Sequence, residues 1–344
     1  MTVLRHLAGA CIAGVVLAAC GGGSSRPVPA FVPAAARSGS KSKLYVANSG
    51  ANTVTVYATG NGSLVRTISH GVSAPDALAF DGAGDLYVAN AGANTVTVYA
   101  AGRTSVLQTI SAGVDVPRAL ALDEAGNLYV ANAGANTVTV YAPGSDSVLR
   151  TISQGINVPD ALGFDSAGNL HVGNVYGNGY SAGTVTIYAP GKKTAKWTLS
   201  QGSSPVWLAF DASDNLYVAN DSPPCCTQNW VSVYDPNKKA LRTLNLVHHP
   251  DAVAFDASGN VYVADNGGKY IHKIGQITVF PPGGTNVLRT VAAGVGHPVA
   301  LAFYGGQTLF VANAQTVTSY AQGKNLQLTI SQGVSAPKAL AFGP

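Results

Sequence analysis

Short runs of apolar residues, separated by clusters of glycine, asparagine and aspartate, follow one another along nearly the whole chain. The clearest set occupies residues 117–122, 128–132, 137–141 and 148–152. Runs of this length between turn-forming residues predict four short β-strands joined by tight turns. The first two runs are almost continuously apolar, which is typical of strands that are covered on both faces. No segment has the length and period of a helix, so the pattern predicts an all-β protein.

The second run recurs as LYVAN, or as a close variant of it, along the chain. Its copies begin at Leu44, Leu86, Leu128, Leu170, Leu216, Val261 and Leu309. The first four copies are 42 residues apart and the later ones 45 to 48. Such a period matches one four-stranded blade, so the repeat predicts a seven-bladed β-propeller with antiparallel blades.

The strand that begins each blade starts with proline, because the missing N–H costs least at that position. These prolines are Pro75, Pro117, Pro159, Pro205, Pro250, Pro298 and Pro337. The first LYVAN has no such strand before it, and the last such strand has no LYVAN after it. We therefore expect the C-terminal strand to complete the blade that begins at Leu44. This pairing would close the ring without a covalent link and remove an exposed sheet edge.

The motif P-x-A-L-A-[FL]-D-x-x-G-N-L-Y-V-A-N resembles the repeat of NHL-type and YVTN-type propellers. The resemblance covers the chain from Leu44 to its C-terminus. It implies the propeller fold but no single activity, because these families include scaffolds, ligand-binding proteins and a few enzymes. The chain departs from the NHL pattern at Ala77, Ala119 and Ala161, where that family prefers glycine. Most second strands also end in asparagine, and Asp265 is the family-like exception.

The N-terminal residues have the features of an export signal. A short polar start precedes an apolar run from Leu7 to Ala19, which is too short to span a bilayer. The run leads into Cys20 and Gly21, and the sequence LAACG resembles the lipobox of bacterial lipoproteins. That resemblance implies cleavage before Cys20 and lipidation of its sulfur, which would anchor the protein durably. The alternative is a secreted protein with a coincidental cysteine.

We therefore expect a signal peptide at residues 1–19, a lipidated Cys20 with a flexible tether at residues 20–43, and the propeller at residues 44–344. The expected location is the bacterial cell envelope, with the lipid anchor in the membrane; Gly21 favours the outer membrane. Charged residues make up 10% of the chain and the net charge is +4, which is too weak to indicate a nucleic-acid partner. We expect a monomer that needs no cofactor and binds an unidentified protein, peptide or glycan.

Two cysteines remain when Cys11 has left with the leader and Cys20 carries lipid. Cys225 and Cys226 are adjacent, and an oxidising envelope compartment favours disulfide formation. A vicinal disulfide is the first interpretation. Pairing between molecules, free thiols and metal binding are the alternatives, although adjacent cysteines are poor joint ligands compared with Cys-x-x-Cys.

Polar residues that recur in the blades are expected to serve the blade itself. An aspartate opens the turn after the first strand, where its side chain can accept hydrogen bonds from the turn amides. These residues are Asp81, Asp123, Asp165, Asp211 and Asp256. An asparagine after the second strand is expected to cap the next turn in the same way, at Asn48, Asn90, Asn132, Asn174, Asn220 and Asn313. Metal or sugar binding by these rings is the alternative.

The residue after the proline varies in charge between blades. In a closed ring Lys338, Asp76, Arg118 and Asp160 would fall on successive blades with alternating sign, near the mouth of the central channel, where Asp251 also lies. Mutual ion pairing is the simplest interpretation, and recognition of a polar ligand is the alternative. A catalytic carboxylate pair formed by Asp76 and Asp160 is a further alternative, but Arg118 stands between them and favours ion pairing over raised pKa values.

Blades four to six depart from the repeat. They carry insertions between the second and third strands, at residues 176–180, 222–230 and 267–273. Aromatic residues and histidines lie in or beside these loops, namely Trp207, Trp230, His248, His249, Tyr270, His272 and His297. Polar loops around exposed aromatics suit a shallow binding site, and drift in unconstrained loops is the alternative.

Catalytic constellations are few. Propeller enzymes of the lactonase and streptogramin-lyase types commonly use glutamate at the channel mouth, but the one glutamate here, Glu124, lies in a turn. The G-x-S-x-G match at residues 179–183 joins two strands, whereas the nucleophile motif needs a strand-to-helix turn. The histidines at positions 248, 249 and 297 would bind a metal only if they converged, and adjacent histidines usually diverge.

The sequence therefore predicts a binding or scaffold protein and assigns no catalytic or metal-ligating residue. The alternative is a lyase or hydrolase that uses His248, His249, His297 and nearby aspartates on the face formed by blades four to six.

Overall fold

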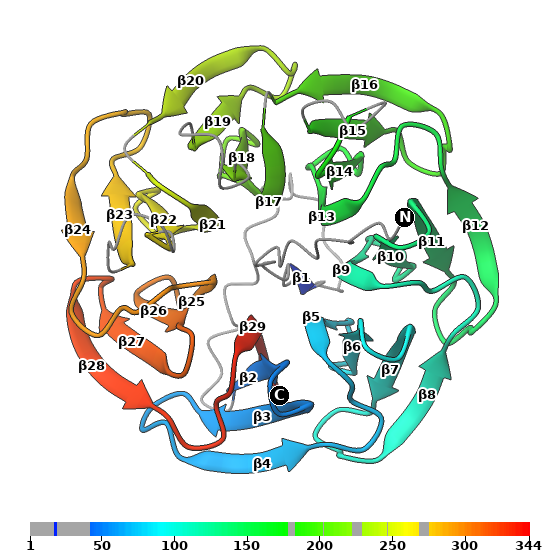
Figure 1. Cartoon of the computed structure of the whole chain (residues 1–344), viewed down its shortest axis with the longest axis horizontal. Coiled ribbons are helices and arrows are strands. Elements are labelled where there is room, and N and C mark those ends of the chain that lie inside the picture. Colours follow the sequence, from blue (N-terminus) through cyan, green and yellow to red (C-terminus); the bar gives the residue numbers. More distant parts are fainter. Residues whose placement is uncertain are drawn as a thin grey trace, which may run out of the picture.

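The computed structural model is a closed ring of seven blades, each built on four antiparallel strands (Figure 1). It describes residues 17–18, 42–177, 183–201, 203–221, 229–245, 247–267 and 275–344. Every regular element within these ranges is a strand. None of the described segments forms a helix with the length and apolarity that crossing a bilayer requires. The predicted seven-bladed, all-β propeller is confirmed.

Each blade runs from the axis outward in the order of its strands. Blade one consists of β29 (Pro337–Gly343), β2 (Lys43–Asn48), β3 (Thr53–Ala58) and β4 (Leu64–Ile68). Blade two consists of β5 (Pro75–Phe80), β6 (Leu86–Asn90), β7 (Thr95–Tyr99) and β8 (Val106–Ile110). Blade three consists of β9 (Pro117–Leu122), β10 (Leu128–Asn132), β11 (Thr137–Tyr141) and β12 (Val148–Ile152).

The remaining four blades repeat this order. Blade four consists of β13 (Pro159–Phe164), β14 (Leu170–Asn174), β15 (Thr184–Tyr188) and β16 (Ala195–Ser200). Blade five consists of β17 (Ser204–Phe210), β18 (Leu216–Asp221), β19 (Trp230–Tyr234) and β20 (Ala240–Leu244). Blade six consists of β21 (Pro250–Phe255), β22 (Val261–Asp265), β23 (Gln276–Phe280) and β24 (Arg289–Val291). Blade seven consists of β25 (Ala300–Tyr304), β26 (Thr308–Ala312), β27 (Val317–Ala321) and β28 (Asn325–Ile330).

Burial follows the position of each strand in its blade. All residues of β5 and β6 are buried, whereas β8 alternates between exposed and half-buried residues before Ile110. The second-strand tyrosine of one blade packs edge-on against the phenylalanine of the next inner strand, with 4.9 Å between the ring centroids of Tyr45 and Phe80. Such edge-to-face pairs are favourable and recur between several blades. The core therefore lies between the blades, around the inner strands.

The ring closes through the C-terminal strand, as the sequence predicts. Strand β29 pairs antiparallel with β2, with Leu340 opposite Val46, and completes blade one beside the axis (Figure 1). The Tyr45 hydroxyl donates a hydrogen bond of 2.8 Å to the Pro344 carbonyl oxygen. Since Leu340 is fully buried, this closing strand is part of the core and not a loose end.

The two-residue strand β1 (Leu17–Ala18) lies inside the ring, parallel to β5 at Ala79 and Phe80 (Figure 1). It belongs to the segment that the sequence predicts to be removed as a signal peptide. The mature ring would then consist of four-stranded blades only.

Asparagines join the blades on one face, which we call the top face. It carries the loops between second and third strands and the connections that enter each blade. The side-chain oxygen of Asn90 accepts a hydrogen bond from Ser73 N–H in the incoming connection, and its amide donates to Thr97 on the third strand. The same arrangement occurs at Asn48, Asn132, Asn174 and Asn313. These residues therefore tie the incoming connection to the blade, which is more than the turn cap that the sequence indicates.

A second set of asparagines clasps neighbouring blades. The side-chain oxygens of Asn52, Asn94 and Asn136 accept hydrogen bonds from Ala74, Val116 and Val158, each of which precedes the first proline of the next blade. All three asparagines have positive φ, a conformation that asparagine tolerates better than most residues. The clasp thus secures the interfaces from blade one to blade four.

Candidate functional site

A β-bulge at the start of the inner strand sets one residue of each blade apart. In blade two Pro75 pairs with Asn90 and Ala77 pairs with Ala89, so Asp76 is the extra residue. Bulges re-aim side chains and are frequent beside active sites. The same irregularity isolates Arg118, Asp160, Val206, Asp251 and Lys338, and Val299 directly precedes β25 in blade seven. We call these seven residues the bulge ring.

The charged members of the bulge ring surround one space near the axis. Burial raises the pKa values of Asp76, Asp160 and Asp251, which belong to blades two, four and six, and the positive charge of Lys338, in blade one, opposes this rise in all three. Each of these residues stands at the start of the innermost strand of its blade, next to the axis. The bulge ring is therefore a charged collar at the top end of the central channel.

Only one of the predicted ion pairs in the collar forms. Arg118 Nη1 lies 3.4 Å from Asp76 Oδ2. Asp160 is 2% exposed, and its Oδ2 has no hydrogen-bond partner. Lys338 makes no ion pair or hydrogen bond with any residue in the described ranges. The prediction of mutual ion pairing is thus correct for Asp76 and Arg118 and wrong for Asp160 and Lys338.

Burial changes the acidity of the collar. Loss of solvent raises the pKa of Asp160 to about 7, and this effect outweighs the opposing influence of Arg118 and Lys338. Burial also raises the pKa of Asp76, although Arg118 pairs with it. The expectation that Arg118 would prevent raised pKa values was wrong, because desolvation of these carboxyls is the larger effect.

Asp251 links the collar to the polar loops of blades five to seven. It is 2% exposed, and its Oδ2 accepts a hydrogen bond of 2.6 Å from the Asn266 side-chain amide. Burial, assisted by the nearby negative charge of Asp221, raises the pKa of Asp251 well above its usual range. Burial therefore favours the protonated form of this carboxyl, which can donate a hydrogen bond.

The two adjacent histidines of blade six point to different carboxylates. His248 Nδ1 lies 3.2 Å from Asp265 Oδ2, and His249 Nδ1 lies 2.7 Å from Asp221 Oδ1. The hydrogen bond to Asp221 raises the pKa of His249. Side chains of both histidines are partly exposed, at 38% and 26%. The predicted divergence of these two residues is confirmed, and each stands in a titratable pair at the top face.

His297 occupies the equivalent place in blade seven. Its φ is 52°, and its Nδ1 lies 2.9 Å from the side-chain oxygen of Asn266. In blades two to four, the residue before the proline donates a hydrogen bond to an asparagine of the preceding blade. In blades six and seven this residue is a histidine, and its imidazole contacts a side chain of the preceding blade. The histidines thus replace a neutral structural contact with ionisable groups, on the face that also carries the collar.

Trp207 does not lie as predicted. Trp207 is 6% exposed, and its indole N–H donates a hydrogen bond to the Val253 carbonyl of the next inner strand. It therefore packs between blades and cannot form an open recognition surface. Trp230 is half-buried at the start of β19 and donates to the Ser232 hydroxyl.

Several predicted positions lie outside the described residues. They are Cys20, Cys225, Cys226, Tyr270, His272 and the G-x-S-x-G serine, Ser181. In the described part of the chain, no group of three or more metal-ligating side chains comes together.

Sequence reasoning missed Asp221 and Asn266. Both directly follow the residue that ends the second-strand repeat, where the first three blades have Ser49, Ala91 and Ala133. An alignment of the repeats would have shown Asp221 and Asn266 at this position in blades five and six, each in the blade that precedes one of the histidines. The contacts to His249 and Asp251 could not be read from the repeat, because they join different blades or different parts of one blade.

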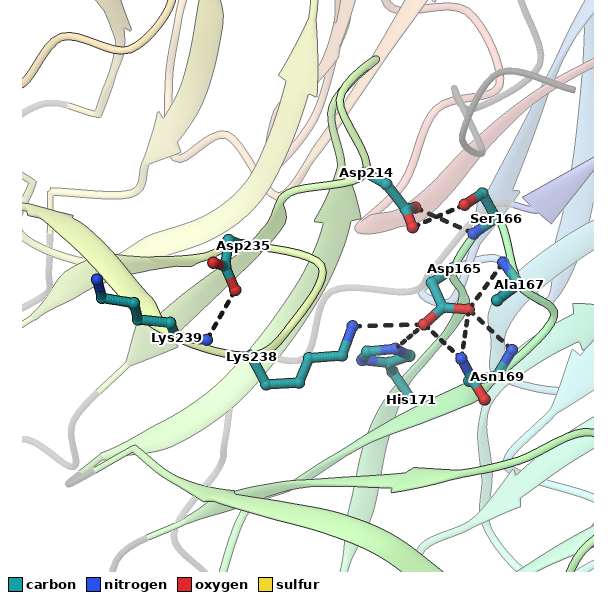
Figure 2. Close-up of polar contacts among 9 residues, drawn as sticks. All are labelled: Asp165, Ser166, Ala167, Asn169, His171, Asp214, Asp235, Lys238 and Lys239. Carbon is teal, nitrogen blue, oxygen red and sulfur yellow. Dashed lines mark hydrogen bonds and ion pairs between the residues drawn. The ribbon is translucent and has the colours of Figure 1, made fainter. Parts of the chain in front are cut away.

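A second polar cluster lies on the opposite face, between blades four and five (Figure 2). Asp165 accepts hydrogen bonds from the buried His171, at 3.0 Å, and from Lys238 Nζ, at 3.3 Å. The histidine and the aspartate–lysine pair are almost entirely enclosed, with side-chain exposures of 0% and 4%. Since the charges of Asp165 and Lys238 pair with each other inside it, we interpret the cluster as structural.

The comparisons with known proteins agree with the fold and give one functional indication. A family model described as "Lactonase, 7-bladed beta-propeller" matches residues 78–164, from β5 to the end of β13. No curated protein matches the chain. Among solved structures, the chain is similar to one named Kuenenia stuttgartiensis hydrazine synthase. Their TM-score is 0.68 at 18% identity, over 81% of this chain and 92% of the other. At this identity the likeness concerns the propeller fold alone.

Proposed function

We propose that the protein is a binding propeller that holds a small polar ligand at the collar on its top face. The observation that carries this proposal is Asp160, whose enclosed Oδ2 has no partner although two cations act on it electrostatically. Buried polar atoms in proteins are nearly always paired. An unpaired carboxylate oxygen beside the channel therefore suits a ligand that supplies the missing donor.

The contacts of blades five to seven support a ligand larger than a single ion. Asp251 and Asn266 extend the polar surface from the collar toward His297, and the Asp221–His249 pair lies in the same region. Half-exposed imidazoles and carboxylates offer both donors and acceptors at the rim. Few, well-placed polar groups are typical of small-molecule sites.

A ligand screen tests this proposal. The purified protein would be screened by thermal shift with sugars, amino acids, short peptides and lactones, and hits measured by calorimetry. We expect Asp160→Asn and His249→Gln to weaken binding of the hits by about tenfold or more, the scale of one charge-assisted hydrogen bond. The control is Asp146→Asn, which removes an exposed carboxylate between β11 and β12. Hits that bind equally to all variants would contradict a site at the collar.

The lipobox resemblance adds a location to the proposal. We infer that lipid on Cys20 holds the propeller in the bacterial cell envelope, at the end of the tether formed by residues 20–43. Replacing Cys20 with serine should move the protein from the membrane fraction to the soluble fraction and abolish labelling by a radioactive fatty acid. A C20S protein that remains in the membrane would disprove this anchor.

Lactone hydrolysis is the second candidate, favoured by the lactonase family match. His249 has its Nδ1 bonded to Asp221, and its Nε2 makes no hydrogen bond within the described residues. As a general base it could take a proton from water while the water oxygen adds to the lactone carbonyl. The ring C–O bond then breaks, and the proton passes to the released alcohol oxygen.

The raised pKa of His249 makes lactone hydrolysis a weaker candidate function than ligand binding. Its raised pKa favours the imidazolium form, so less of the basic form is available to take a proton from water. Turnover of simple lactones, followed by acid release, should fall about 100-fold or more in His249→Gln if hydrolysis is the function. Absence of turnover in the unaltered protein would leave binding as its activity.

A further inference from the structure

We infer that the ligand of the collar is a small zwitterion, a molecule that carries one ammonium and one carboxylate group, such as a free amino acid. This inference rests on the proposed function, because it specifies the ligand of the same site. Its basis is a pair of opposite charges, Asp160 and Lys338, which occupy the same bulge beside the axis in blades four and one and have no ion-pair or hydrogen-bond partner among the described residues.

Asp160 is the anionic pole. Its nearest cation by position in the ring is Arg118, in the neighbouring blade, but that guanidinium pairs with Asp76 at 3.4 Å. The cation that pairs with the Asp160 carboxylate must therefore come from a ligand, or from a rearrangement that breaks the Asp76–Arg118 pair. An ammonium group supplies this charge together with up to three N–H donors.

Lys338 is the cationic pole. It follows Pro337 at the bulge of β29, is half-buried, and acts on the acids of three other blades without an ion pair to any of them. A ligand carboxylate can accept a charge-assisted hydrogen bond from its ammonium group. Because Lys338 is carried by the closing strand, the cationic pole exists only when the ring is complete.

The separation of the two poles favours one ligand that carries both charges. Asp160 and Lys338 belong to blades four and one, and they influence each other electrostatically but do not form a salt bridge. A ligand with a single charge would pair with only one of these two side chains. The other charge would stay without a partner, and an unpaired buried charge is costly in free energy.

A homologous series tests the charge and the spacing together. Glycine, β-alanine, 4-aminobutyrate, 5-aminopentanoate and 6-aminohexanoate would be titrated into the purified protein by calorimetry. Each has two matched controls, the alkylamine and the carboxylate of the same chain length. We expect one length to bind at least about tenfold more tightly than both of its single-charge controls, as one additional charge-assisted contact implies.

Two variants separate the poles. In Asp160→Asn the affinity of the preferred zwitterion should fall to about that of the matched carboxylate, and in Lys338→Met to about that of the matched amine. Neither substitution removes a contact found among the described residues, so both variants should fold, which circular dichroism would verify. The control Asp146→Asn should bind as the unaltered protein does.

The pH dependence provides an independent readout. The pKa of Asp160 is about 7, and the charged groups that act on it are Arg118, Asp76 and Lys338. An ammonium ligand binds the ionised carboxylate, so affinity should rise from about pH 6 to about pH 8, on either side of that pKa. The ligand charges themselves do not change in this range. The rise should disappear in Asp160→Asn.

Two outcomes would overturn the inference. One is a series in which no zwitterion binds better than its single-charge controls, including a series in which nothing binds. The other is a preferred zwitterion whose affinity is unchanged in both variants. The proposed function is judged separately: a neutral or singly charged hit from the broad screen that is lost in Asp160→Asn would support a binding site at the collar while disproving its zwitterion specificity.

Discussion

Asp76 and Asp160 occupy the same bulge in two blades, yet their carboxylates differ in state. Asp76 pairs with Arg118, whereas Asp160, on the other side of that arginine, has an oxygen without a partner. The sequence shows the alternation of charge but not which carboxylate the arginine selects. Nor does it show how deeply each carboxyl is buried, and burial determines the pKa of both residues. At the scale of single residues, the sequence therefore gives the positions of the charged collar residues but not their chemical state.

Asp160 should make the stability of the unliganded protein depend on pH. Its folded-state pKa is raised to about 7 from an ordinary value of 3.8. Between these values the folded protein binds a proton that the unfolded chain releases, so the free energy of unfolding falls as pH rises through this range. The amide that replaces the carboxyl in Asp160→Asn does not ionise, so this variant should be more stable than the unaltered protein at pH 8, by roughly 2–4 kcal/mol. The advantage should shrink at about pH 5, where the folded-state carboxyl is protonated.

Urea unfolding at the two pH values measures this effect. Asp146→Asn serves as control and should change stability equally little at both, because Asp146 is exposed. A stabilisation by Asp160→Asn that is the same under the acidic and the alkaline condition would show that Asp160 ionises normally.

At the scale of elements, blade four shows what a repeat predicts and what it does not. Blades one, three, five and six join a second-strand tyrosine to an outer-strand arginine, as in Arg66 to Tyr45. Blade four has His171 and Trp197 at these positions, and Lys238 of blade five supplies the cation instead. The change from tyrosine to histidine is visible in the sequence. Its compensation is not, because Lys238 lies in a hairpin of the next blade.

Loss of Lys238 should loosen the contact between blades four and five. Lys238→Met leaves the buried carboxylate of Asp165 without its cation, and breaking a buried pair in this way costs about 3 kcal/mol. The neighbouring Lys239 is exposed, and its side chain points away from the cluster (Figure 2). Lys239→Met is therefore the matched control and should change stability by less than about 0.5 kcal/mol. Equal effects of the two substitutions on urea unfolding would show that the pair contributes nothing.

At the scale of the whole molecule, blades that follow the repeat differ in their contacts from blades that depart from it. The LYVAN repeat made the number of blades and the ring closure predictable, because every blade uses the same burial pattern. The first three interfaces are secured by asparagine clasps, whereas His249 and His297 hold the corresponding positions in blades six and seven. Periodicity cannot predict contacts that occur once, and these are the contacts that give the top face its ionisable groups. The candidate site was predicted in region but not in detail for this reason.

Ring closure can be tested by comparing one leucine in two blades. Leu340 in β29 and Leu78 in β5 occupy the same position of the inner strand, and both are fully buried. Only Leu340 reaches its blade through the non-covalent joint between the two ends of the ring. If the joint is as well packed as an uninterrupted blade, Leu340→Ala and Leu78→Ala should each reduce the free energy of unfolding by about 3 kcal/mol.

The comparison of these two variants by urea unfolding separates a firm joint from a frayed one. A closing strand that detaches easily would already leave Leu340 in water for part of the time, so its truncation would cost much less than that of Leu78. A loss below about 1 kcal/mol for Leu340→Ala, beside a full loss for Leu78→Ala, would therefore contradict the closed ring. It would also weaken the case for the collar, because Lys338 is held in place by the same strand.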